Sequence, residues 1–305
     1  GHGWVVSPYA TIGGYFSTEV ESGEQGDSFT LDDLAVMAYG QLTPGISYLA
    51  ELEAVGFYRK DFTSGDESGD RSLHIERLYG DWQLDESFNL RVGKQITPIG
   101  YWNREPINVL RDTASNTLYG SLMFPKFLTG VDANGYLPGS DTYYHAFFQA
   151  THDMDEAYIN IPNAHFYGFS VEREMPTGWS VGGSIGEYIT LLGSERTRFV
   201  QANTRYDGEE WTWMAEGIIA RTDHDTVPDR YTLAGYVQGL YRFDPTLAAV
   251  SRYEYYDRRS DGYTDHIGVA GLSCRPIFPV SIKGESQWHS HHAQTRFVFS
   301  FSVVS

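Results

Sequence analysis

Hydrophobic and polar residues alternate along most of this chain with a period of two, which indicates β-strands that each have one apolar face. The segment 46–60 shows the pattern most clearly, because Ile46, Tyr48, Ala50 and Leu52 alternate with Ser47, Glu51 and Glu53. The same alternation predicts sixteen strands, over residues 4–19, 33–42, 46–60, 71–84, 87–96, 127–137, 141–150, 164–174, 178–189, 196–206, 210–221, 230–243, 246–256, 265–274, 280–288 and 294–303.

The connections between these strands alternate in length. Short turns such as Thr43-Pro44-Gly45 and Asp85-Glu86 are followed by longer, mostly acidic loops. A local pattern cannot distinguish a soluble sandwich from a membrane barrel, but strand length can. The predicted strands run to about 10–15 residues, whereas strands of globular proteins are usually about 5–6 residues long and a tilted membrane strand needs about 9–11. We therefore predict an all-β fold, in which residues 1–305 form a single domain, a closed antiparallel transmembrane β-barrel with short turns and both termini on one rim.

The alternation stops over residues 97–126. This segment, TPIGYWNREPINVLRDTASNTLYGSLMFPK, contains three prolines and no sustained period. Loops of this length are uncommon in compact chains and are usually functional. A disordered excursion is the alternative, but the aromatic content of the segment argues against it. We expect the loop to fold into the lumen of the barrel and to narrow it.

Composition excludes several classes of protein. No apolar run approaches the roughly 18–20 residues of a membrane helix. The single cysteine, Cys274, excludes an intramolecular disulfide framework and a multi-cysteine metal site. The net charge of −18 argues against nucleic acid as a partner. No signal peptide is recognisable at Gly1, as expected for a mature or a cytosolic chain.

The polar stripes of the strands are predicted to line the lumen, with eight acids nearly balanced by seven bases. Charges this numerous imply a wet lumen or a tight network of ion pairs, and sixteen strands leave room for an aqueous channel. Structural ion pairs between strands are the alternative role for any one of these residues. The predicted wall residues are Glu51, Glu53, Asp81, Asp132, Glu172, Glu216, Glu254 and Glu285, with Arg77, Arg91, Arg205, Arg242, Arg252, Lys283 and Arg296.

Five charged residues of the segment 97–126 are candidates for the narrowest point of the lumen. They are Arg104, Glu105, Arg111, Asp112 and Lys126. Two roles are open for them, contact with a solute or attachment of the loop to the wall.

The segment Leu90–Gly100, LRVGKQITPIG, resembles the passage from strand to third loop in Gram-negative porins, especially the phosphate-selective porin O and P family. In that family an R-x-G strand runs into P-x-G at the start of the loop. The resemblance implies a trimeric sixteen-stranded channel in the bacterial outer membrane, in contact with the lipid bilayer and lipopolysaccharide. Two features differ from the family pattern. The predicted wall is balanced in charge rather than a ladder of arginines and lysines, and the chain ends in Val303-Val304-Ser305 rather than on an aromatic residue.

Other candidate chemistry is weaker. His289, His291 and His292 are candidate ligands of a transition metal, with three solvated loop histidines as the alternative. The sequence contains no G-x-S-x-G, H-E-x-x-H or C-x-x-C-H motif, so we expect neither an enzyme nor a bound cofactor.

The leading hypothesis is a porin that passes small hydrophilic solutes and ions with weak charge selectivity, tilted toward cations at low salt. The alternatives are a sheath around a partner such as an electron-transfer cytochrome, and a barrel lipase or protease. An enzyme needs a nucleophile and a base on the wall, and a lone Ser or His on a strand is no evidence of that pair. A loop that occupies the lumen leaves no space for an inserted protein, and so distinguishes a channel from a sheath.

Overall fold

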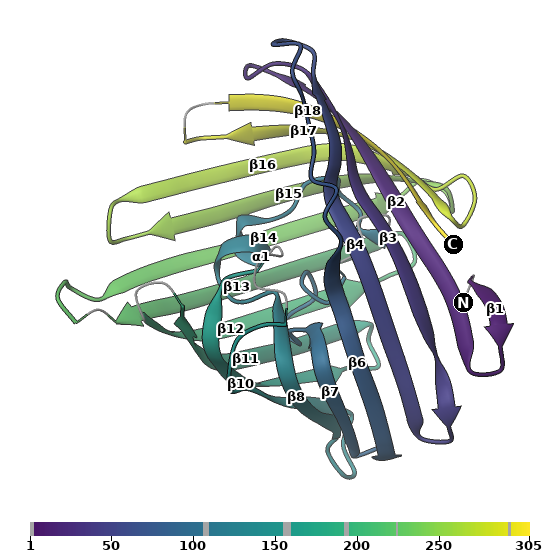
Figure 1. Ribbon diagram of the computed structural model, residues 1–305. Coiled ribbons are helices and arrows are strands. Elements are labelled where there is room, and N and C mark those ends of the chain that lie inside the picture. The colour runs from purple at the N-terminus through teal and green to yellow at the C-terminus, as the bar shows by residue number, and fades with distance from the viewer. Residues whose placement is uncertain (1–2, 106–109, 155–159, 192–194, 224, 292–293) are drawn as a thin grey trace.

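The computed structural model describes residues 3–105, 110–154, 160–191, 195–223, 225–291 and 294–305. Sixteen antiparallel strands form a closed barrel, because the last strand, β18, pairs with β2 at the start of the chain (Figure 1). The wall strands are β2 (Ala10–Gly23), β3 (Ser28–Thr43), β4 (Ile46–Asp61), β6 (His74–Asp85), β7 (Phe88–Ile96), β8 (Phe127–Tyr136), β9 (Thr142–Gln149), β10 (Asn163–Glu174), β11 (Trp179–Thr190), β12 (Arg196–Asp207), β13 (Trp211–Asp223), β14 (Arg230–Arg242), β15 (Leu247–Arg258), β16 (Tyr263–Cys274), β17 (Val280–His289) and β18 (Gln294–Val304).

Two shorter strands and one short helix complete the described elements. The first predicted strand, 4–19, is two strands in the structure, because the chain turns at Pro8-Tyr9 and β1 (Trp4–Ser7) folds back against β2. Proline has no N–H to donate to a ladder, and this explains why the strand stops there. Strand β5 (Glu67–Ser68) pairs with the end of β4. The helix α1 (Leu118–Leu122) lies within the segment 97–126, and among the described residues no helix is long and apolar enough to cross a membrane.

Both termini lie at the rim of the short turns (Figure 1). The Ser305 N–H donates to the Gly14 carbonyl at 2.8 Å, so the end of the chain is fastened to β2. Gly45 adopts a φ of 85° in the turn after Pro44, a conformation that glycine reaches without a steric cost. Asp244 holds another of these turns, because its Oδ1 accepts the Thr246 and Leu247 N–H groups at 2.7 and 2.9 Å.

The outer face of the barrel is an exposed apolar band. One row of cross-strand neighbours runs from β10 to β14 through Phe169, Ile185, Val200, Ile219 and Leu233, and Val200 in this row is 63% exposed. At the short-turn rim, Trp211 stacks on Trp213 with ring centroids 5.4 Å apart. An apolar band with aromatic residues at its border is typical of barrels in lipid, and a continuous patch of this kind is unfavourable in water.

Candidate functional site

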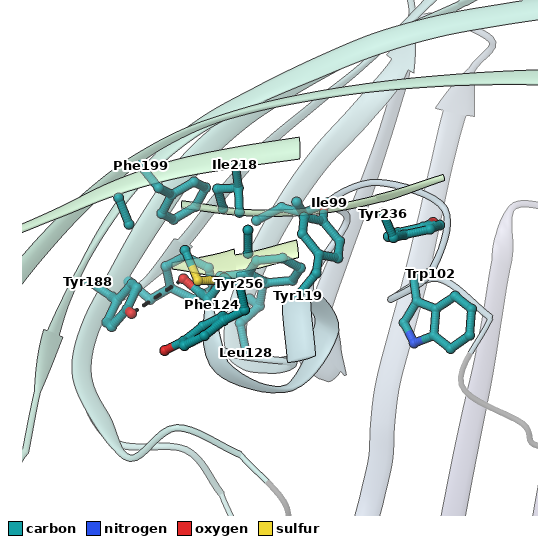
Figure 2. Close-up of a cluster of buried hydrophobic side chains, with 14 of the residues drawn as sticks. Ile99, Trp102, Tyr119, Phe124, Leu128, Tyr188, Phe199, Ile218, Tyr236 and Tyr256 are labelled. Atoms are coloured by element: carbon teal, nitrogen blue, oxygen red, sulfur yellow. Dashed lines mark hydrogen bonds between the residues drawn. The ribbon is translucent and has the colours of Figure 1, made fainter. Parts of the chain in front are cut away.

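The described parts of the segment 97–126, residues 97–105 and 110–126, lie inside the barrel, as the sequence predicts, and pack against the inner face of the strands from β9 to β15. Its side chains Ile99, Trp102, Tyr119, Met123 and Phe124 are almost fully buried. Figure 2 shows this aromatic cluster, in which the Tyr188 hydroxyl also donates to the Met123 carbonyl at 3.4 Å. The wall contributes Phe147, Phe166, Tyr188, Phe199, Ile218, Ala220, Ala234, Tyr236 and Tyr256 to the cluster.

Two glycines make room for inward aromatic rings on this part of the wall. Gly168 of β10 and Gly186 of β11 are cross-strand neighbours, flanked by Phe147 of β9 and Phe199 of β12. A Cβ atom at Gly168 would lie 2.6 Å from the Phe147 ring, and one at Gly186 would lie 2.5 Å from the Phe199 ring. The inner face here is therefore apolar, whereas the sequence pattern placed apolar residues on the outer face only.

Three glutamates of alternate strands hold the loop by its backbone. Glu216 of β13 accepts the Tyr101 and Trp102 N–H groups at 2.8 and 3.0 Å. In the same way Glu254 of β15 accepts from Leu118 and Tyr119 at 2.9 and 3.5 Å, and Glu285 of β17 accepts from Ala114 and Ser115 at 3.2 and 2.8 Å. Hydrogen bonds to an ionised acceptor are about twice as strong as neutral ones. These three predicted wall residues therefore attach the loop to the wall.

Glu216 also accepts hydrogen bonds from side chains. Its carboxylate accepts the hydroxyls of Tyr119 and Tyr236. Gly100 passes so close that a Cβ atom there would overlap with Glu216 Oε1, and its φ is 65°. Only glycine combines this backbone conformation with this close approach.

Two guanidinium groups lie over the Trp102 ring. The Cζ atoms of Arg111 and Arg252 are each 5.0 Å from the centroid of this ring, within the range of a cation–π contact. Arg252 of β15 also donates to Thr113 Oγ1 and Ser115 Oγ, both at 2.9 Å. Arg111 donates to the Glu105 carbonyl at 2.6 Å, and burial lowers its pKa to about 10.

The five predicted constriction residues divide into two groups. Arg104 forms an ion pair with Glu172 of β10, and Asp112 lies 3.7 Å from the Arg275 guanidinium. Glu105 contributes its backbone carbonyl to Arg111, as described above. Arg111 and Lys126, in contrast, line an internal cavity. Their assignment to the narrowest point of a pore stays a prediction.

Most of the other predicted wall residues bond to one another or to the loop. Arg77 donates to Glu51 at 2.7 Å, Arg91 forms two hydrogen bonds with Asp81 at 2.8 and 2.9 Å, and Asp132 lies 2.8 Å from His145 Nδ1. Lys283 donates to the Thr113 carbonyl at 3.5 Å, Arg242 to Thr212 at 2.7 Å, Arg205 to Asp207 at 2.9 Å, and Arg296 to Glu21 at 3.4 Å.

A cavity of about 790 Å³ lies beside the loop. Six carboxylates from four neighbouring strands line it, with four bases on the loop, β15 and β18. The acids are Glu19 and Glu21 of β2, Asp32 and Asp33 of β3, Glu53 of β4 and Glu76 of β6, and the bases are Arg111, Lys126, Arg252 and Arg296.

Five of these acids are absent from the predicted wall, for two reasons. The predicted strands 4–19 and 33–42 are shorter than β2 and β3, which leaves Glu21 and Asp32 outside them, and two strand pairings have irregular registers at this level. The pairing of β3 with β4 shifts between Leu31 and Asp33, so that Asp32 and Asp33 both line the cavity. The pairing of β4 with β6 shifts at Glu76, which lines the cavity although its neighbour Arg77 bonds to Glu51. A β-bulge places two consecutive residues opposite one. Two consecutive charged residues, as in Asp32-Asp33 and Glu76-Arg77, are the sequence signal that would have suggested a bulge.

Two of the candidate metal ligands are in contact with neighbouring side chains. His289 Nδ1 lies 3.1 Å from Asp265 Oδ2, and the His291 ring lies 4.1 Å from the Tyr263 ring between centroids. His292 is outside the described residues. Within the part of the chain that the structure describes, no three His, Cys, Asp or Glu residues are grouped so as to hold a metal ion.

A closed sixteen-stranded antiparallel barrel with its third long loop folded inside is the porin architecture. The structure is similar to the anion-selective porin of Comamonas acidovorans, with a TM-score of 0.73 over 97% of this chain and 99% of that one, at 10% sequence identity. It is also similar to OmpF of Salmonella typhi in complex with daunomycin (TM-score 0.69, 11% identity, 97% of both chains) and to the outer membrane channel DcaP of Acinetobacter baumannii (0.68, 11%, 97% of both chains). No family model and no curated protein matches the sequence. At these identities the likeness concerns the fold.

Proposed function

We propose that this protein is a porin of the bacterial outer membrane, a passive diffusion channel for small hydrophilic solutes and ions. The observation that carries the proposal is the cavity of about 790 Å³, lined by charged side chains, beside a loop fastened inside a closed barrel. A wall of buried charges without water would be strongly unfavourable. A water-filled path past the loop explains both the charges and the cavity.

The outer surface supports the location in a membrane. The exposed apolar band faces outward around the strands, and aromatic residues lie at its short-turn border. The likeness in fold to several outer membrane proteins, among them DcaP, supports the same location. The lipid bilayer and lipopolysaccharide are the expected surroundings of such a surface.

The loop argues against the sheath. An inserted cytochrome needs an empty lumen, whereas Trp102, Tyr119 and Phe124 pack against the wall inside this barrel. We propose no catalytic step for this chain.

We propose weak charge selectivity for the channel. Six acids and four bases line the cavity, so the excess of negative charge along the path is small. Most of the net charge of −18 lies in the loops, where salt screens charges beyond a Debye length of about 8–10 Å. We expect a mild preference for cations at low salt, and no phosphate-like preference for anions.

A homotrimer is the proposed assembly. Its support is the likeness in fold to OmpT of Vibrio cholerae in its trimer form, with a TM-score of 0.69 and 12% identity over 97% of this chain and 99% of that one. Native mass spectrometry in mild detergent tests this part, and a monomer at all concentrations would contradict it.

Planar-bilayer recording tests the proposed function. Purified protein should insert in uniform conductance steps, and the reversal potential in a salt gradient should be small at high salt and shift toward cations at low salt. Absence of conductance steps from folded protein would contradict a channel, and a strong anion preference at both salt concentrations would contradict weak selectivity.

A further inference from the structure

The two faces of the cavity carry opposite charge. The acids come from the consecutive wall strands β2, β3, β4 and β6, whereas Arg111 and Lys126 belong to the loop. Arg296 of β18, the strand next to β2, lies beside the acids and donates to Glu21 at 3.4 Å. The separation follows from the fold, because the loop packs on the far side of the barrel, against β9 to β15, and presents its basic side chains toward the acidic strands. Opposite charges across a narrow aqueous gap orient a polar solute between them.

Some of these charged side chains form no direct bond to a neighbour. Among the residues that the structure describes, the carboxylates of Glu19 and Asp32 make no hydrogen bond or ion pair. The Lys126 ammonium group likewise makes no hydrogen bond or ion pair, and it lies over the Phe127 ring, 5.5 Å from its centroid. The charges of Asp32 and Lys126 are close enough to interact without forming a bond. A buried or half-buried charge is unfavourable unless it is paired or hydrated.

The cavity also has apolar lining between the charged faces. Leu118, Leu122 and Phe124 of the loop and Ile161 of the neighbouring loop contribute to it. An inorganic ion makes no use of such surface, whereas a solute with a short carbon skeleton buries apolar area against it.

We propose that the cavity favours solutes that carry both an ammonium and a carboxylate group, such as amino acids and short peptides. The ammonium group faces Asp32 and Glu19, the carboxylate faces Lys126 and Arg111, and the carbon skeleton lies against the leucines of the loop. This inference rests on the proposed function, because it names the class of solute that the same channel prefers.

Liposome swelling with two solutes of similar size and no net charge tests the inference. The probes are glycylglycine, which is zwitterionic, and arabinose, which is neutral, and the quantity compared is the ratio of their swelling rates. Neither probe carries a net charge, so no counterion flux enters the comparison. We expect a ratio at least about twofold higher for the wild type than for either Asp32→Asn or Lys126→Gln, because each substitution removes one of the two opposed charges.

Two matched control variants keep the charge changes away from the cavity. Lys60→Gln alters a lysine paired with Glu67 at the end of β4, and Asp141→Asn alters an exposed carboxylate at the short-turn rim. Both should keep the wild-type ratio, and heat-modifiable migration on gels checks that every variant is folded.

The outcomes distinguish this inference from the proposed function. If the protein swells liposomes in arabinose, but Asp32→Asn and Lys126→Gln both keep the wild-type ratio, the inference is wrong. The proposed function as a channel would still stand. A higher ratio of glycylglycine to arabinose swelling in Lys126→Gln than in the wild type also overturns the inference. The acids alone would then explain the preference, through the ammonium group of the dipeptide. Folded protein that gives no swelling in arabinose overturns the proposed function, and the inference with it.

Discussion

The Gly100 backbone and the Glu216 carboxylate are in direct contact, so that no side chain larger than a hydrogen atom fits between them. The contact allows Glu216 to reach the next two N–H groups, at Tyr101 and Trp102. This single point of attachment connects the start of the loop to β13 on the far wall.

Gly100→Ala should therefore destabilise the barrel more than an ordinary glycine substitution. We expect Gly100→Ala to weaken hydrogen bonds to a charged acceptor, each of which contributes about 1.5–3 kcal/mol. Gly139→Ala is the matched control, because Gly139 has a similar φ of 68° but open space around it. Unfolding in denaturant, followed by tryptophan fluorescence, measures both variants. Equal destabilisation by the two substitutions would mean that the contact with Glu216 contributes nothing.

Trp102 joins the loop to two arginines, and its removal should loosen this part of the loop. Trp102 is only 5% exposed, and truncation of a buried Trp to Ala costs about 3–5 kcal/mol. Trp179→Ala, at an exposed outer site, should cost much less in the same denaturant titration. A similar small loss for both variants would contradict the packing of Trp102 against Arg111 and Arg252.

The charge of Lys126 should make ion selectivity depend on alkaline pH. Burial, and then the positive charge of Arg111, lower the pKa of Lys126 below its ordinary value of 10.5, although Glu76, Glu53 and Asp33 oppose this. Its charge is therefore lost as the pH rises toward that value. Between the lowered pKa of the folded protein and 10.5, Lys126 binds fewer protons in the folded than in the unfolded chain. The contribution of Lys126 to the free energy of unfolding therefore rises with pH over this range.

The reversal potential in a salt gradient measures the effect of Lys126 on selectivity. Cation preference should increase between neutral pH and about pH 10 in the wild type, and the increase should be smaller in Lys126→Gln. Exposed Lys60→Gln is the control that should behave as the wild type. An identical pH profile for the wild type and Lys126→Gln would show that this ammonium group does not influence the path.

Strand positions were predictable from the sequence because a barrel strand has one outward stripe, and Ile185 or Val200 cannot face water. The inward loop was predictable for a related reason, since a segment with Tyr101, Trp102 and Phe124 is too apolar to remain in solvent. The first prediction rests on a local pattern and the second on local composition, and a single sequence contains both.

The lining of the cavity was not predictable in the same way. The alternation of inward and outward side chains fails at a bulge, so Glu76 was left out of the predicted wall. Asp32 was left out because β3 begins earlier than the predicted strand 33–42. The alternation also gives no sign of a second apolar surface, where the loop packs on the inward rings of Phe147 and Phe199. Contacts between distant segments decide both features. The attachment of the loop by Glu216, Glu254 and Glu285 also depends on distant contacts. Each carboxylate bonds to backbone N–H groups more than 100 residues away in the sequence.

The central claim is that the segment 97–126 narrows a water-filled path through the barrel, and single-channel conductance after deletion of residues 104–112 tests it most directly. The deletion leaves the contacts of Gly100, Tyr101 and Trp102 with Glu216 in place and removes Arg111 from the cavity. Because a barrel of sixteen strands is wide enough for an aqueous channel, conductance should rise by about twofold or more. A folded deletion variant with the conductance of the wild type would contradict the account, because the loop then does not limit the path.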